Sequence, residues 1–155
     1  MSSRISSTFF LIAGLSLAGC FRASDVEIGA QLIKTAPAHD AEWSAAITAT
    51  KTPPLPFVTK VEFVADPKFS GKTVDEALAA LPKDYPFSFV FIADERALTD
   101  EGYPCYCVDL TSDGRPRFRV TARHIASVEN NLSLANMDFS EFMDAAKPLG
   151  VFRGF

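Results

Sequence analysis

Two cysteines separated by one residue are the first candidates for chemistry. Cys105 and Cys107 stand in the segment PCYC. On a strand, side chains at i and i+2 point to the same face with their Cα atoms about 6.5 to 7 Å apart, close to the limit for a disulfide. The pair is therefore either a strained, easily reduced redox pair or two free thiols that fill the apolar face of a strand.

Metal and cofactor chemistry find little support in the residue spacing. A metal site at the cysteines would need two further ligands, but His39 and His124 are isolated in the sequence. The chain also has no Gly-rich phosphate loop, no G-x-S-x-G elbow and no H-E-x-x-H motif. We therefore expect no metal and no cofactor.

Three carboxylates are candidate acids or bases of a hydrolase: Asp94, Glu129 and Asp138. Asp94 follows an apolar segment, where α/β folds often place functional carboxylates, although a turn residue that ends a strand would look the same. No nucleophile stands beside a plausible base in the sequence, so the catalytic residues stay unassigned.

A polar stretch near the C-terminus has two interpretations. In the first it is a turn-rich connector whose asparagines bond to nearby peptides, with Asp138 capping the last helix. In the second it is a binding patch for a ligand or a protein partner, formed by Glu129, Asn130, Asn131, Asn136, Asp138 and Arg153.

Alternating apolar periods predict the elements that position these residues. Strands are expected at 31–35, 58–64, 87–93, 104–110 and 117–121. Helices are expected at 40–51, from 73 to about 81, and from 138 onward. This order predicts a single small α/β domain with a mixed sheet, built from β-α-β-α-β units plus a hairpin and flanked by helices.

Local signals refine this prediction. Asp40 is the expected N-cap of the first helix, and capping boxes are expected at Thr73 and Asp138. The segment 87–93 is nearly continuous in apolar residues, as is typical of a central strand covered on both faces. Asp113-Gly114 favours an antiparallel hairpin between the last two strands.

Composition limits the remaining choices. The chain has 155 residues, 48% hydrophobic residues and a formal net charge of −4, which suits one globular domain. Basic and acidic residues are interspersed without a Lys/Arg block, so nucleic acid is not an expected partner.

The N-terminus has the layout of an export signal, with Arg4, an apolar stretch at 9–17 and small residues at 18 and 19. Even if the apolar stretch is extended to 8–19, its 12 residues would form a helix of only about 18 Å, too short for a hydrocarbon core of about 30 Å. We therefore expect removal rather than a retained membrane span.

Leu17-Ala18-Gly19-Cys20 resembles the lipobox of bacterial lipoproteins at all four positions. The resemblance implies a signal peptide at 1–19, cleavage before Cys20 and acylation of Cys20 by groups such as palmitate. Residues 20–30 would then tether a domain at 31–155 to membrane lipid. Phe21 rather than Asp follows the cysteine, which favours the periplasmic leaflet of the outer membrane, or the outer face of the plasma membrane in a single-membrane host.

A second resemblance covers most of the chain after residue 31. The stretch SVENNLSLANMDF at 127–139 and the ending GVFRGF at 150–155 resemble an uncharacterised bacterial family, a domain of unknown function. Aliphatic residues usually stand at its PCYC positions, which favours core filling there. The resemblance implies no activity.

Two classes of function follow. We expect a non-enzymatic, membrane-anchored module that binds a protein or small ligand in the cell envelope. The alternative is a small envelope enzyme, either a hydrolase or a thiol-dependent redox protein.

Overall fold

The structure, a computed structural model, describes residues 29–155. The predicted signal peptide and Cys20 lie outside the described residues, as does all of the tether except its last two residues. The described part is a single small α/β domain, as predicted. Its strands are β1 (Gln31–Lys34), β2 (Glu62–Val64), β3 (Phe89–Ala93), β4 (Pro104–Asp109) and β5 (Arg117–Thr121). Its helices are α1 (Asp40–Thr50), η1 (Pro67–Phe69), α2 (Val74–Ala79), α3 (Glu95–Thr99), η2 (Ala122–His124), α4 (Ile125–Ser133) and α5 (Phe139–Ala146).

The five strands form one mixed sheet in the order β2-β1-β3-β4-β5. β1 pairs in parallel with β2 and β3, and β4 pairs antiparallel with β3 and β5. Every residue of β3 is buried, which confirms the predicted central strand. The predicted hairpin between β4 and β5 is confirmed as well.

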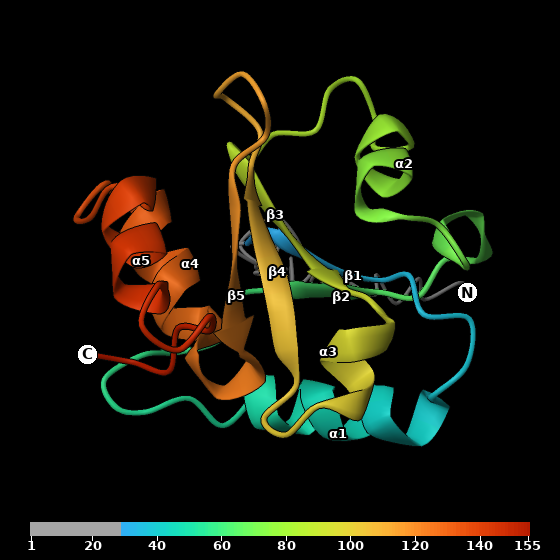
Figure 1. The fold of residues 1–155 in the computed structure, drawn as a ribbon, viewed down its shortest axis with the longest axis horizontal. Helices are drawn as coiled ribbons and strands as arrows, with labels where there is room; N and C mark the ends of the chain where they lie inside the picture. Colours follow the sequence, from blue (N-terminus) through green and yellow to red (C-terminus); the bar gives the residue numbers. More distant parts are fainter. Residues whose placement is uncertain (1–28) are drawn as a thin grey trace, which may run out of the picture.

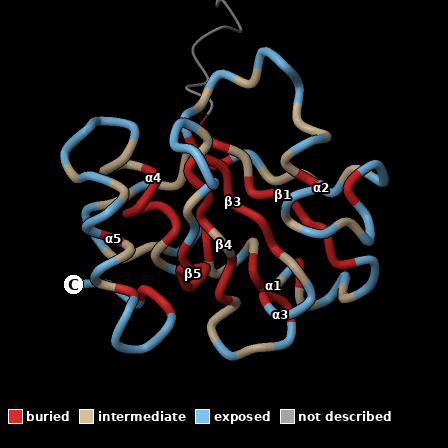
Figure 2. Tube along the Cα trace, turned by 45° about the horizontal axis from the view of Figure 1, so that its top comes forward, coloured by how far each residue is buried: buried red, intermediate tan, exposed pale blue. Residues whose placement is uncertain are grey.

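Helices cover both faces of the sheet (Figure 1), and the buried stretches of the chain concentrate along the strands between them (Figure 2). The larger core cluster packs residues of α1, α3, α4 and α5 against one face, around Phe91 and Phe142. The smaller cluster packs α2 and η1 against the other face, around Phe69 and Ile92. The predicted mixed sheet flanked by helices is therefore confirmed.

Both predicted capping boxes are present. The Thr73 hydroxyl accepts a hydrogen bond from the Glu76 backbone N–H, and the Glu76 carboxylate accepts one from the Thr73 N–H at 2.8 Å. At α5, the Glu141 carboxylate accepts a hydrogen bond from the backbone N–H of Asp138 at 2.7 Å. Each box satisfies backbone donors that a helix start leaves open.

The start of α1 differs from the prediction. His39 rather than Asp40 is the N-cap, with a left-handed backbone and no side-chain capping bond. The Asp40 carboxylate instead pairs with the Lys34 ammonium at 2.5 Å.

The strand predicted at 58–64 is shorter than expected. Its pairing with β1 begins only at Gln31↔Glu62. Val58, which would start the longer strand, is 69% exposed.

The connector predicted at 127–139 is wrong in its first half, which is helical. α4 places Ile125 and Val128 in the core and packs Leu132 against it. These residues stand at i, i+3 and i+7, which is helical spacing, so their burial outweighs the low helix propensity of the neighbouring asparagines.

The C-terminal segment adds a short edge to the sheet. Phe152 forms a parallel bridge with Val120 of β5. Its N–H donates to Arg119 O at 2.7 Å, and its carbonyl accepts from Thr121 N–H at 3.1 Å. Phe152 is only 1% exposed, so this segment belongs to the core.

Over residues 29–155 no helix is long and apolar enough to span a bilayer.

Candidate functional site

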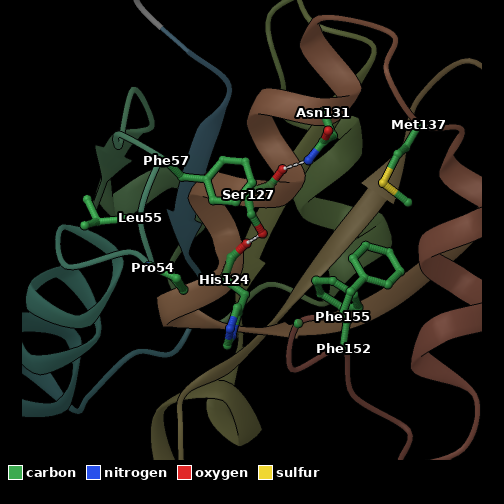
Figure 3. A pocket seen from close by; sticks show the side chains of 10 residues that line it. Pro54, Leu55, Phe57, His124, Ser127, Asn131, Met137, Phe152 and Phe155 are labelled. Carbon is green, nitrogen blue, oxygen red and sulfur yellow. Dashed lines mark hydrogen bonds between the residues drawn. The ribbon is translucent and has the colours of Figure 1, made fainter.

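A pocket of about 370 Å³ lies where three distant segments of the chain meet. Figure 3 shows the Pro-rich loop before β2 on one side, the start of α4 behind, and the C-terminal residues on the other side. We call it the apolar pocket, and its lining consists of Pro54, Leu55, Phe57, His124, Ser127, Asn131, Met137, Phe152, Gly154 and Phe155. Its volume falls in the range of small-molecule sites, which starts at about 300 Å³.

α4 supplies polar groups that bond mainly within the helix. The Ser127 hydroxyl donates to the His124 carbonyl at 2.9 Å, and the Asn131 amide nitrogen donates to the Ser127 carbonyl at 2.8 Å. Both bonds are drawn in Figure 3. Because these donors are already used, the surface they leave in the apolar pocket favours an apolar occupant.

His124 is held in one orientation at the base of α4. Its Nδ1 forms a hydrogen bond of 2.9 Å with the Thr121 hydroxyl, and its ring meets Phe152 edge to face at 6.2 Å. Burial, and secondarily the charge of Arg123, lowers the pKa of His124 below its ordinary value. The imidazole is therefore neutral at pH 7, which suits a mostly apolar site.

The C-terminal segment passes close to this imidazole because residue 154 is glycine. A Cβ at Gly154 would lie 2.9 Å from His124 Nε2, and the backbone there has φ +99°. Beyond it, Phe155 contacts the Phe152 ring at 5.0 Å and stays 85% exposed.

The Pro-rich loop forms the opposite wall. A turn closed by the Phe57 N–H and the Pro54 carbonyl at 3.1 Å shapes this loop. It leaves Leu55 94% exposed at the edge of the apolar pocket.

The predicted binding patch is divided among several places. Asn131 lines the apolar pocket. Glu129 and Asn130 line a separate pocket of about 140 Å³ beside Gly29. Glu129 is 2% exposed and accepts a hydrogen bond from the Ser133 hydroxyl at 2.9 Å.

The other three patch residues are also separate. Asn136 is exposed, and its backbone N–H donates to Asn131 O at 2.9 Å. Asp138 begins α5, where Glu141 bonds to its N–H. Arg153 is exposed, with its guanidinium beside Gly102 of the loop before β4. The structure therefore brings Asn131, but not the other five, into the apolar pocket.

Cys105 and Cys107 are free thiols, both buried in the larger core cluster. Burial, with a further contribution from the Asp94 carboxylate, raises the pKa of Cys105 to about 12. Burial and the Asp109 carboxylate raise the pKa of Cys107 well above its ordinary value. Since the thiolate is the reactive form, these surroundings favour core filling, while the redox role stays an untested hypothesis.

Asp94 lies at the end of β3, where it caps α3 and binds Arg119. Its carboxylate accepts from Ala97 N–H at 2.9 Å and from both guanidinium nitrogens of Arg119 at 3.0 and 2.7 Å. Burial acts to raise the pKa of Asp94, but these hydrogen bonds and the charge of Arg119 outweigh it and hold the pKa low. A carboxylate that is ionised at neutral pH and hydrogen-bonded on both oxygens favours a positioning role over acid catalysis.

Charged groups also collect at the carboxyl ends of the parallel strands, where open α/β sheets commonly bind ligands. Lys34, Asp40 and Asp66 line a pocket of about 210 Å³ there. Lys34 is paired with Asp40, and His39 Nε2 lies 2.6 Å from the Glu95 carboxylate. These pairings leave the apolar pocket as the stronger candidate.

Among residues 29–155, no group of three or more His, Cys, Asp or Glu is placed to hold a metal ion.

Sequence reasoning missed most of the apolar pocket. It treated the prolines at 53–56 only as helix breakers and His124 only as a failed metal ligand. The available signal was that both quoted motifs, SVENNLSLANMDF and GVFRGF, supply lining residues, namely Ser127, Asn131, Met137, Phe152, Gly154 and Phe155.

Comparison with known proteins places the whole described domain in one family. Residues 29–155 match the family described as Domain of unknown function (DUF6924). No curated protein matches the chain. Because the match spans most of the sequence, including both motifs at the apolar pocket, the chain belongs to the DUF6924 family.

Proposed function

We propose that this protein is a non-enzymatic binding module whose apolar pocket receives an apolar small molecule or side chain, and that acylated Cys20 holds it at a membrane of the cell envelope. The observation that carries the proposal is the apolar pocket itself, where aromatic rings and a neutral imidazole surround about 370 Å³ of open space. Mostly apolar walls with a few fixed polar groups are the usual character of ligand sites.

The groups considered for catalysis support this choice over an enzyme. Asp94 is bonded to Arg119 and to a helix N-terminus. The two cysteines are buried, and their pKa values are raised. The His124 imidazole forms a hydrogen bond with the Thr121 hydroxyl, and among the described residues no carboxylate is hydrogen-bonded to its other nitrogen. An activated nucleophile would need such a second partner to orient its base.

The anchor part of the proposal comes from the sequence. The lipobox at 17–20 is followed by only a short segment before the domain begins. Two or three acyl chains on Cys20 would hold the protein stably, since each buried methylene contributes about 0.8 kcal/mol.

Filling the apolar pocket tests the binding function. Asn131→Trp places an indole into the apolar pocket, whereas Asn130→Trp alters the preceding residue of the same helix, which lines a different pocket. We measure binding of the apolar fluorophore 1-anilinonaphthalene-8-sulfonate to the full chain. We expect Asn131→Trp to weaken binding by about tenfold and Asn130→Trp to leave it unchanged. Equal binding by both variants, at unaltered thermal stability, would refute the assignment.

A further inference from the structure

We infer that the rim of the apolar pocket docks on the surface of a phospholipid bilayer, with Leu55 and Phe155 entering the interfacial region. This inference rests on the proposed function, because it uses the anchor at Cys20 and identifies the source of apolar ligands as the membrane. It adds a defined orientation: the mouth of the apolar pocket faces the lipid.

The first support is the exposure of two large apolar side chains. Leu55 is 94% exposed and Phe155 is 85% exposed, and both line the apolar pocket. Figure 3 shows them on opposite sides of the pocket. Apolar side chains left in water around a pocket mark an interaction surface. Side chains of this kind enter the boundary between headgroups and acyl chains in peripheral membrane proteins.

The second support is charge. The segments that line the apolar pocket or adjoin its lining are 51–58, 121–127, 131–138 and 150–155. They carry three basic residues, Lys51, Arg123 and Arg153, and one acidic residue, Asp138, although the whole chain has a formal net charge of −4. All three basic residues are exposed. Among the described residues none of them forms an ion pair. Lys51 lies over the Phe63 ring and the Arg153 guanidinium lies beside Gly102, so these charges flank the apolar pocket rather than line it. A local excess of basic side chains around the apolar pocket complements anionic headgroups.

The third support is the length of the tether. Eight residues lie between Cys20 and Gly29, and the nine steps from one to the other, at about 3.3 to 3.6 Å each, span at most about 32 Å. The Gly29 N–H donates to the Lys60 carbonyl at 2.8 Å, and both residues line a separate pocket that also contains Leu134. The tether therefore keeps the domain close to the bilayer but does not itself turn the rim toward the lipid. Tethering converts docking into an intramolecular step, so a small contact area is enough.

Depth-dependent quenching tests this orientation. Tryptophan is introduced singly as Leu55→Trp, Phe155→Trp or, as a matched control, Leu134→Trp. Leu134 is an apolar residue that is 62% exposed and lies outside the lining of the apolar pocket. The mature acylated chain is reconstituted on vesicles of phosphatidylethanolamine and phosphatidylglycerol with bromine on their acyl chains. Trp43 is buried, and its signal is subtracted using the parent chain.

The expected result is quenching at positions 55 and 155 that exceeds quenching at position 134 by about twofold or more. Equal quenching at all three positions, or none while the protein still sediments with vesicles, overturns the docking and leaves the anchor intact. Failure to sediment overturns both the anchor and the docking. Indoles at 55 and 155 that become shielded without vesicles as protein concentration rises would show that a second copy covers the rim, which also overturns the inference.

Discussion

The contact between Asp94 and Arg119 links the end of the central strand to the last strand of the sheet. One Arg119 nitrogen also donates to the Pro104 carbonyl at 2.7 Å, and the guanidinium carbon lies 3.8 Å from the centre of the Tyr106 ring. Arg119 is 5% exposed, so its charge is compensated mainly by Asp94. A planar, two-nitrogen contact of this kind cannot be reproduced by lysine.

We predict that Asp94→Asn lowers the free energy of unfolding by about 3 kcal/mol at pH 7, because it leaves a buried charge without its partner. Asparagine is also a good N-cap residue, so the cap of α3 is kept and the loss of stability reports the missing negative charge. The pKa of Asp94 is lowered in the folded state, so its contribution is present above the unfolded pKa of about 3.9 and disappears as pH falls through the folded value. Urea titrations of both proteins between pH 7 and pH 3 should show the difference shrinking in acid.

Asp100→Asn is the matched control for this measurement. Asp100 pairs with Arg96 at 2.8 Å, but both side chains are exposed. Exposed pairs contribute at most about 1 kcal/mol. Equal losses of unfolding free energy in the two variants would mean that the buried Asp94–Arg119 pair stabilises the fold no more than an exposed pair does.

At the scale of elements, the sequence predicted those whose signals were local. The capping box at Thr73, the continuous apolar run of β3 and the Asp113-Gly114 turn each lie within a few residues, and each was confirmed. α3 was missed because its five residues are too short to show a period. α4 was not predicted because its two asparagines have low helix propensity and are typical of turns, although its apolar residues have helical spacing.

The candidate site was harder to predict than the fold for a physical reason. The apolar pocket forms only when the loop at 54–57 meets α4 and the C-terminal segment. Such a meeting depends on tertiary packing, and no spacing along the chain encodes it. Of the residues proposed for a binding patch, Asn131 reached the apolar pocket because it follows Ser127 by one helical turn.

The close passage of the C-terminal segment past His124 gives a prediction for this element. Gly154→Ala adds a Cβ 2.9 Å from His124 Nε2, whereas Gly71→Ala adds one with nothing within 4 Å. Both positions have positive φ, so both variants carry backbone strain of about 1 kcal/mol. Gly154→Ala should cost about 1 to 2 kcal/mol more in urea unfolding, because the imidazole must move. The His124 ring resonances should shift only in that variant, and unchanged resonances would contradict the close approach.

At the scale of the whole molecule, the proposed anchor and the described domain make separate contributions. The domain buries its own core across both faces of the sheet. Stable membrane attachment is proposed to come from acylated Cys20, which lies outside the described residues, while the rim of the apolar pocket is proposed to set the orientation of the domain. The two can therefore be tested independently.

We predict that Cys20→Ser abolishes incorporation of labelled palmitate into the full chain expressed in bacteria, because a hydroxyl cannot form the thioether. Cys105→Ser is the matched control. It changes a buried thiol of the core and should leave labelling intact. Gel fluorography of the two variants beside the wild type gives the readout. Undiminished label in Cys20→Ser would place the acyl group elsewhere and contradict the anchor.

The bridge between Phe152 and β5 bears on the order in which the fold is completed. Phe152 is 1% exposed and contacts Phe142 at 5.2 Å, so the larger core cluster stays incomplete until this side chain docks. Its partner in the bridge is Val120, about 30 residues earlier, so a long loop must close first and this closure costs chain entropy. We therefore expect this edge of the sheet to form late in folding and to open early in partial unfolding.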